Sequence, residues 1–124
     1  MEVSTLANFI TWQRAVVLAA NVIKFCNQTS ISRHRWMCDQ LNRSALSIPS
    51  NIAEGYERRA GKDTDRFYLI AKGSCAEALT QLKVAQLANL VSPAETQELE
   101  KQCEEVLKLI AGVLRARRNT RPPA

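Results

Sequence analysis

The chain has 124 residues, of which 46% are hydrophobic, and a formal net charge of +5. This length fits one domain whose core is large enough to fold without disulfides or a structural metal. Only four glycines and four prolines interrupt the sequence. There is no sustained alternation of polar and apolar residues and no Asn-Gly or Asp-Gly turn, which argues against a β-rich fold. The composition therefore predicts an all-α protein built from long helices.

Histidine and cysteine usage limits the chemistry of the chain. His34 is the single histidine, which excludes a His-rich metal site; it lies in a predicted loop and is expected at the surface. The four cysteines form no Cys-x-x-Cys pair and lie among apolar helical positions: Cys26, Cys38, Cys75 and Cys103. We expect buried free thiols, as in cytosolic proteins. No pattern provides an activated nucleophile with its base, so we expect no catalytic site, no metal and no cofactor.

The sequence contains no candidate membrane span or secretory signal. The apolar run at residues 15–23 contains Asn21, is flanked by Arg14 and Lys24, and is too short to cross a bilayer. The N-terminus begins with Glu2 instead of a basic cluster. We expect a soluble, cytoplasmic protein with no membrane partner.

The first helix is expected at about residues 6–27, with Leu6 or Phe9 as its start, and it carries two neighbouring apolar stripes. One stripe consists of Trp12, Val16, Ala19, Ile23 and Cys26, and the other of Ala15, Leu18, Val22 and Phe25. Together they form an apolar arc that is wider than one core contact requires, so part of it is expected to face another subunit. Residues 28–32 are predicted to form a polar loop that ends in a helix cap at Ser32.

The second helix is expected at about residues 33–59, and it presents two different faces. The apolar face carries Met37, Leu41, Ala45, Ile48 and Ile52, and the polar face carries Arg43, Ser47, Asn51, Glu54 and Arg58. Pro49 removes one backbone hydrogen bond, but the apolar period continues past it, so we predict a kinked continuous helix that Gly61 stops. The polar face is either solvated or a buried hydrogen-bonded network. Serine and asparagine are poor helix formers, which favours the network.

The third helix is expected at about residues 63–89, with Asp63 or Thr64 as its N-cap. Its apolar seam consists of Tyr68, Ala71, Cys75, Ala78, Leu82 and Ala85. The neighbouring seam has a polar centre at Ser74, Glu77 and Gln81. We expect this centre to face the polar face of the second helix, with Arg43, Asn51 or Glu54 as its partners.

The fourth helix is expected at about residues 93–117. Ser92-Pro93-Ala94-Glu95 supplies an N-cap serine, a proline at the first helical position and a capping-box glutamate. Its buried stripe is predicted to be Leu99, Cys103, Val106, Ile110 and Val113. Short connections between four helices predict an antiparallel up-down-up-down four-helix bundle. We expect a single domain over residues 1–118 and a flexible basic, proline-containing tail over residues 119–124.

Three segments of the chain resemble one known family. They are residues 12–15, 40–55 and 66–77. The most specific part is the Ser-Ile-x-x-Asn-Ile-Ala-Glu-Gly run at residues 47–55, followed by Ala-x-Gly-Ser-x-x-Glu at residues 71–77. Over about residues 9–114 the chain resembles the four-helix bundle proteins named after the intervening sequences of 23S ribosomal RNA. It resembles more distantly the accessory protein of diversity-generating retroelements.

The resemblance implies a bundle that assembles as a ring-like homopentamer with a basic surface, and an association with nucleic acid or a reverse transcriptase. The matched polar positions are Arg43, Ser47, Asn51, Glu54, Gly55, Arg66, Ser74 and Glu77. We expect an internal polar network that fixes helix register or a subunit interface; the alternative is a ligand or nucleic-acid contact site. The chain departs from the family in residues 28–35, which lack the usual Phe-Pro and acidic residues, and in its basic tail.

Positive charge is concentrated at residues 58–66 and in the C-terminal tail. Repeated around a ring, such patches are expected to bind a phosphate backbone. The predicted nucleic-acid contacts are Arg58, Arg59, Lys62, Arg115, Arg117, Arg118 and Arg121. Only Tyr56, Phe67 and Tyr68 lie near these clusters, so base stacking is not supported. The alternative is a solvated surface with a flexible tail.

We therefore expect a non-enzymatic, oligomeric nucleic-acid-binding protein that contacts RNA or DNA through phosphates. The alternative is an oligomeric protein-binding scaffold, for example for a reverse transcriptase, which the wide apolar arc of the first helix motivates.

Overall fold

A computed structural model describes residues 4–120 of the chain. Over this range the regular structure is entirely helical, so the all-α prediction is confirmed. The helices are α1 (Ser4–Ala7), α2 (Ile10–Cys26), α3 (Thr29–Ser32), α4 (Arg35–Glu57), α5 (Thr64–Leu87) and α6 (Pro93–Asn119). None of these helices is both long enough and apolar enough to cross a membrane.

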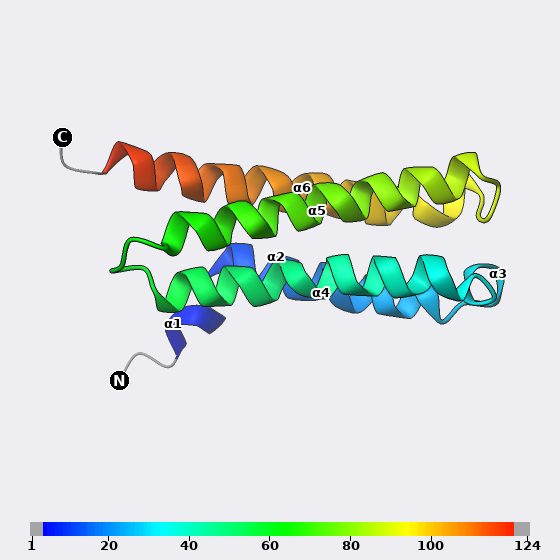
Figure 1. Cartoon of the computed structure of the whole chain (residues 1–124), viewed down its shortest axis with the longest axis horizontal. Helices are drawn as coiled ribbons and strands as arrows, with labels where there is room; N and C mark the ends of the chain where they lie inside the picture. The colour runs from blue at the N-terminus through cyan, green and yellow to red at the C-terminus, as the bar shows by residue number, and fades with distance from the viewer. Residues whose placement is uncertain (1–3, 121–124) are drawn as a thin grey trace.

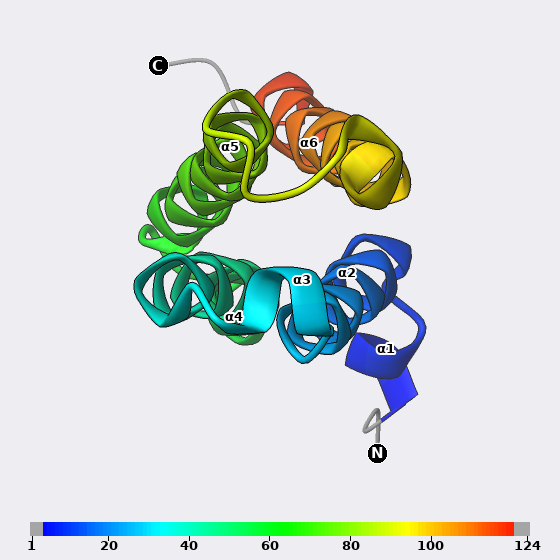
Figure 2. The same ribbon diagram turned by 90° about the vertical axis from the view of Figure 1, so that its right-hand side faces the viewer.

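The four long helices lie side by side along one axis, and each runs antiparallel to the next one in the chain (Figure 1). Seen from the end, they occupy the corners of a square, and α3 lies across the ends of α2 and α4 (Figure 2). Among neighbouring long helices, contacts are most extensive between α4 and α5 and least extensive between α2 and α6. The C-terminal end of α6 and the α4–α5 connection therefore share one end of the molecule (Figure 1).

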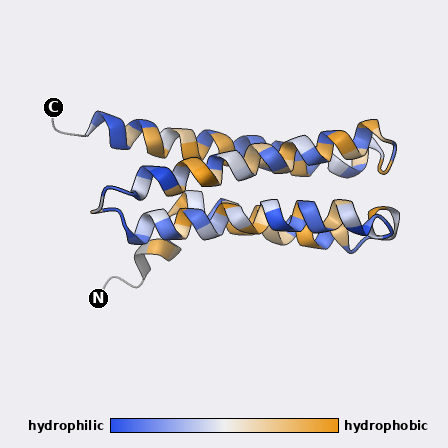
Figure 3. Cartoon of the chain, viewed as in Figure 1, coloured by the Kyte–Doolittle hydropathy of each residue, from blue (hydrophilic) through white to orange (hydrophobic). Residues whose placement is uncertain are grey.

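The core is formed by the inward apolar stripe of each long helix, and apolar and polar residues alternate along the helices accordingly (Figure 3). The largest fully buried apolar side chains include Leu18, Ile31, Leu41, Ile48, Ile52, Leu82 and Ile110. The predicted apolar seam of α5, from Tyr68 to Ala85, is buried throughout. Full burial of a leucine or isoleucine side chain contributes about 1.5–3 kcal/mol to folding. The four cysteines are buried and free, as expected.

The two stripes of α2 have different environments. Ala15, Leu18, Val22 and Phe25 face the core. The other stripe is divided, since Ala19 and Cys26 are buried whereas Val16 and Ile23 are exposed. Asn21, which interrupts the apolar run, donates from Nδ2 to Oε1 of Gln102 at 3.0 Å and so joins α2 to α6. The outer part of the predicted apolar arc is therefore left uncovered in the single chain.

Two boundaries near the N-terminus differ from the prediction. The first helix is broken at residues 8–9, because Phe9 adopts an extended conformation with φ −79° and ψ 106°. The predicted loop at residues 28–32 contains the short helix α3. Ser32 does not cap the next helix, since α4 begins after His34. Single-turn helices such as α1 and α3 carry no amphipathic period, so no sequence pattern indicates them.

The α4 helix is continuous through Pro49, as predicted. It ends at Glu57, before Gly61, and its last carbonyls accept from the backbone N–H of Arg58. Asp63 holds the N-cap position of α5 but makes no capping bond with its side chain. Instead the Thr64 hydroxyl, which is buried, donates to the Arg58 carbonyl and closes the connection.

The α5–α6 connection uses two local signals. Asn89 has a left-handed backbone with φ 61°, a conformation that asparagine tolerates better than most residues and that ends helices. The predicted capping box of α6 is formed: the Ser92 backbone N–H donates to Oε2 of Glu95 at 2.7 Å. Residues 121–124, which complete the predicted tail, lie outside the described residues.

Candidate nucleic-acid interface

The two basic segments of the sequence meet at one end of the molecule. Arg117, in the last turns of α6, pairs through Nε with Oδ1 of Asp65 at 2.6 Å, and its Nη1 donates to the Arg59 carbonyl at 3.5 Å. These contacts join the C-terminal end of α6 to the α4–α5 connection. We call this region the basic end. Its basic residues are Arg58, Arg59, Lys62, Arg66, Lys72, Arg115, Arg117 and Arg118.

Aromatic rings hold several of these guanidinium groups. Cζ of Arg58 lies 5.2 Å and that of Arg66 4.9 Å from the centre of the Phe67 ring. Cζ of Arg59 lies 4.4 Å from the centre of the Tyr56 ring. Such contacts fix the position of a cation while leaving its full charge in place. The few aromatic residues near the clusters therefore organise the charges.

Two of the predicted contacts are already paired with acids of the chain. Arg58 lies 2.8 Å from Glu54, an exposed pair one helical turn apart that raises the pKa of the guanidinium further. Arg117 is only 27% exposed in its ion pair with Asp65. Both arginines also suit the helix ends where they lie, since cations favour a helix C-terminus. They are less available to a ligand than Arg59, Lys62, Arg115 and Arg118.

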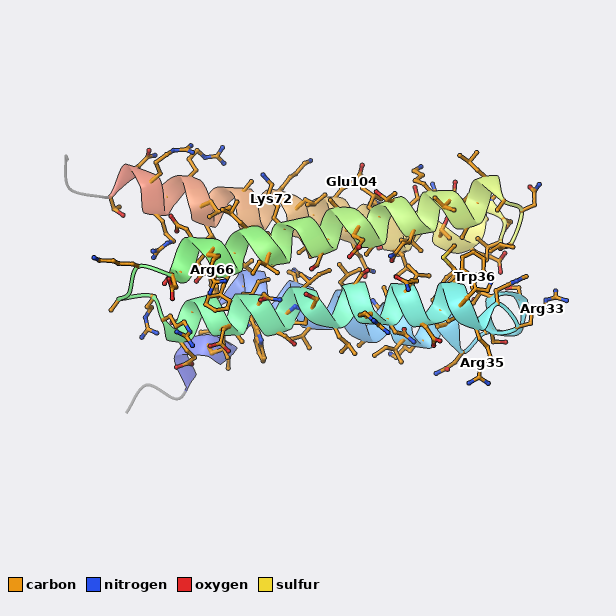
Figure 4. The ribbon with its side chains drawn as sticks, in the orientation of Figure 1. Arg33, Arg35, Trp36, Arg66, Lys72 and Glu104 are labelled. Atoms are coloured by element: carbon orange, nitrogen blue, oxygen red, sulfur yellow. The ribbon has the colours of Figure 1, made fainter. Side chains whose placement is uncertain are left out.

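A groove between α5 and α6 forms part of the basic end; we call it the α5–α6 groove. Its volume is about 370 Å³. It is lined by Asp65, Leu69, Lys72, Ala111, Leu114, Arg115 and Arg118. Figure 4 shows Lys72 on the α6 side of α5, well separated from Arg33, Arg35 and Trp36 at the opposite end. No sequence pattern singles out Lys72, because it stands alone between apolar and small residues.

The predicted polar positions divide into an inner and an outer group. In the inner group, the Ser74 hydroxyl donates to the Ser47 hydroxyl at 2.9 Å. Nδ2 of Asn51 donates to the Ser47 carbonyl at 2.8 Å and to its hydroxyl at 3.0 Å. The outer group, Arg43, Glu54, Arg66 and Glu77, is exposed. In the single chain the eight positions do not form one buried cluster.

Ser44, which we did not predict, is the buried partner of the α5 polar seam. Its hydroxyl lies 3.1 Å from Oε1 of Glu77 and 3.1 Å from Oε1 of Gln81, and the residue is 4% exposed. Arg43 and Glu54, named as partners of that seam, lie on the exposed side instead. Ser44 is adjacent to the predicted polar face, so the rotation of α4 against α5 decides which serine is buried.

Gly55 allows α4 and α5 to approach closely beside the basic end. A Cβ at this position would lie 2.8 Å from Cε1 and 3.0 Å from Cδ1 of Tyr68. Tyr68 is buried, and burial raises the pKa of its phenol, although the neighbouring Arg117 opposes this. The ring thus stays neutral beneath the guanidinium of Arg117, whose Cζ lies 6.0 Å from its centre.

The remaining site predictions fall outside this arrangement. Arg121 lies beyond the described residues. Within residues 4–120 no three His, Cys, Asp or Glu side chains gather in a way that could hold a metal ion. The arrangement provides organised positive charge around a groove whose walls are only partly apolar.

Comparison with known proteins agrees with this architecture. The sequence profile of the family described as 23S rRNA-intervening sequence protein matches residues 7–112. The fold is similar to that of a protein with unknown function from the S23 ribosomal protein family of Bacteroides thetaiotaomicron VPI-5482, at 18% identity and a TM-score of 0.73. The match covers 84% of this chain and 97% of that one. No curated protein matches the sequence. The chain belongs to the family of 23S rRNA-intervening sequence proteins.

Proposed function

We propose that the chain is a non-enzymatic nucleic-acid-binding protein whose basic end contacts RNA or DNA phosphates. The observation that carries this proposal is the convergence of residues 58–66 and 115–118 at one end, with guanidinium groups held on aromatic rings. The family name refers to an intervening sequence of 23S rRNA, which makes RNA the first nucleic acid to test.

Phosphate contacts would dominate the affinity. Neutralising phosphates releases condensed counterions, and log Kobs then falls with log salt by about 0.7–0.9 per contact. Arg59, Lys62 and Arg66 are exposed on the α4 and α5 side of the basic end. None of them forms an ion pair with another of the described residues. Their charges are therefore available to a polyanion.

The experiment compares two triple variants of equal charge. Arg59→Gln, Lys62→Gln and Arg66→Gln remove three charges at the basic end; Lys24→Gln, Arg33→Gln and Arg35→Gln remove three elsewhere. Binding of a labelled structured RNA is measured at several salt concentrations. We expect the first variant to lose affinity and to have a salt slope smaller by about 2, while the second keeps the wild-type slope. Equal losses in both variants would show that only net charge matters.

We also propose that the protein assembles as a ring-like homo-oligomer, a homopentamer by the family resemblance. Exposed apolar side chains support a subunit contact on two helices. They include Ile10, Val16, Val17 and Ile23 on α2, and Ile70 and Val84 on α5. Sedimentation equilibrium of the wild type and of Val17→Asp tests this: a wild-type mass of one chain would contradict it, and loss of assembly in the variant would place α2 in the contact.

A second candidate function is a protein-binding scaffold, for example for a reverse transcriptase, because the apolar face of α2 is uncovered in the single chain. Binding to a purified reverse transcriptase that survives nuclease treatment and is lost in Val17→Asp would favour it. Loss of binding on nuclease treatment would favour the nucleic-acid proposal. We place either activity in the cytoplasm, where four buried free thiols remain reduced.

A further inference from the structure

We propose that the α5–α6 groove holds one nucleotide of a single-stranded segment. The phosphate would lie among Lys72, Arg115 and Arg118, and the sugar or base would lie against Leu69 and Leu114. The inference rests on the proposed function and names the ligand of one part of the basic end.

The charge of the groove favours a phosphate. Lys72, Arg115 and Arg118 form no ion pair with any other residue in the range 4–120. Asp65 is the single acid among the lining residues, and Arg117 pairs with it at 2.6 Å. The chain thus neutralises the acid and leaves three cations facing the groove. A phosphodiester oxygen would complete charge-assisted hydrogen bonds with them.

The apolar lining of the groove favours more than a bare phosphate. Leu69 is 56% exposed and lines the groove together with the three cations. Ala111 and Leu114 add further apolar surface from α6, and both are half-buried. A free phosphate gains nothing from this surface, whereas the sugar or base of a nucleotide would bury it. The volume of about 370 Å³ is within the usual range for a small-ligand site.

The position that a base would have to occupy favours a single-stranded ligand over a duplex. In a duplex the bases are stacked and paired inside, so only the phosphates and groove edges are presented to a helical surface. An unpaired nucleotide can turn its base or sugar onto Leu69 while its phosphate stays among the cations. The groove therefore distinguishes a single strand from a duplex through the leucine, and attracts both through the charges.

The experiment measures fluorescence anisotropy of the full-length protein with a labelled single-stranded oligonucleotide and with a duplex of the same sequence. Two variants change the groove, Leu69→Ser and Lys72→Gln. Two controls change the same residue types elsewhere: Leu87→Ser, on the same helix and 84% exposed, and Lys101→Gln, exposed on α6. Circular dichroism and the mass in solution are recorded for each protein.

We expect Leu69→Ser to weaken single-strand binding about fivefold to tenfold through lost apolar contact, and to leave duplex binding unchanged. Lys72→Gln should weaken both and reduce the salt slope for the single strand by about 0.7. Leu87→Ser and Lys101→Gln should bind like the wild type.

Several results would overturn the proposal. Equal effects of Leu69→Ser on single strand and duplex, or no effect on either, would remove the nucleotide from the groove while leaving the proposed function intact. Absence of any nucleic-acid binding by the wild type would contradict both the nucleotide in the groove and the proposed function. Polyglutamate is added as a competitor of the labelled single strand. If Leu69→Ser weakened polyglutamate binding as much as single-strand binding, the ligand of the groove would be an acidic peptide instead of a nucleotide. A changed mass for Leu69→Ser would assign the leucine to a subunit contact.

Discussion

At the scale of single residues, two glycines inside helices have opposite roles. A Cβ at Gly55 would meet Tyr68 at 2.8 Å, whereas a Cβ at Gly73 would meet nothing within 4 Å. Both positions are helical, where alanine is favoured over glycine by about 1 kcal/mol. Packing therefore decides whether an alanine at Gly55 stabilises or destabilises the fold, and helix propensity decides this at Gly73.

We predict that Gly55→Ala destabilises the protein by about 1–3 kcal/mol, because an inserted methyl group forces a buried ring to move. Gly73→Ala should stabilise it by about 0.5–1 kcal/mol. Urea denaturation of the two variants gives both values. If Gly55→Ala stabilised the protein as much as Gly73→Ala, this would contradict the close contact between α4 and α5 at Gly55.

The buried thiols give the protein a pH dependence on the alkaline side. Burial, with the neighbouring Cys38 thiol, raises the pKa of Cys26 from 9.0 to about 12. The unfolded chain ionises this thiol near pH 9, but the folded chain keeps its proton. Above pH 9 unfolding therefore releases the proton of this thiol. Because a higher pH favours proton release, the free energy of unfolding falls as the pH rises.

For this one group we expect a loss of about 1 kcal/mol between pH 8 and pH 10. The measurement is urea denaturation at the two pH values for the wild type and for Cys26→Ala. The variant should start less stable and lose less on alkalinisation. An identical pH dependence in both proteins would contradict the buried thiol.

At the scale of helices, α4 and α5 are joined by a short polar chain: Asn51 to Ser47, and Ser47 to Ser74. These groups are half-buried, so removing the Ser47 hydroxyl leaves Ser74 without this partner in a poorly solvated place, while Asn51 keeps its bond to the Ser47 carbonyl. Glu54, by contrast, forms an exposed pair with Arg58, and such pairs contribute little to stability.

We predict that Ser47→Ala costs about 1–3 kcal/mol, because it deprives Ser74 of its partner and Asn51 of one of its two acceptors. Glu54→Gln should change the stability by less than about 0.5 kcal/mol. Chemical denaturation of the two variants compares the costs directly. Similar small costs for both would mean that the Ser47 hydroxyl is not part of a network that stabilises the fold.

The sequence predicted these helices better than their contacts. The apolar period identified the four long helices and the buried seam of α5, and the capping box located the start of α6. The choice between Ser44 and Ser47 as the buried partner depends on the rotation of two packed helices, which a one-dimensional pattern does not contain. The break at Phe9 depends on packing too, since its ring centre lies 5.0 Å from that of Tyr56.

At the scale of the whole molecule, the antiparallel order of the helices creates the basic end. The end of α4, the start of α5 and the end of α6 must share one end of an up-and-down arrangement, so the meeting of residues 58–66 and 115–118 followed from the predicted topology. The position of Lys72 beside α6 did not follow from the topology, because it depends on which side of α5 faces α6. The ion pair of Arg117 with Asp65 did not follow from the topology either. This pair makes Arg117 less available to a ligand than the unpaired arginines of the basic end.

The central claim, that the basic end binds nucleic acid through phosphates, is tested most directly by one titration. Labelled structured RNA is titrated with protein of known mass in solution, and the anisotropy is followed at several salt concentrations. We predict micromolar or tighter binding at low salt, with log Kobs falling against log salt at a slope of about −3 or steeper, as four or more phosphate contacts require. No binding at low salt, or a slope near zero, would contradict the account.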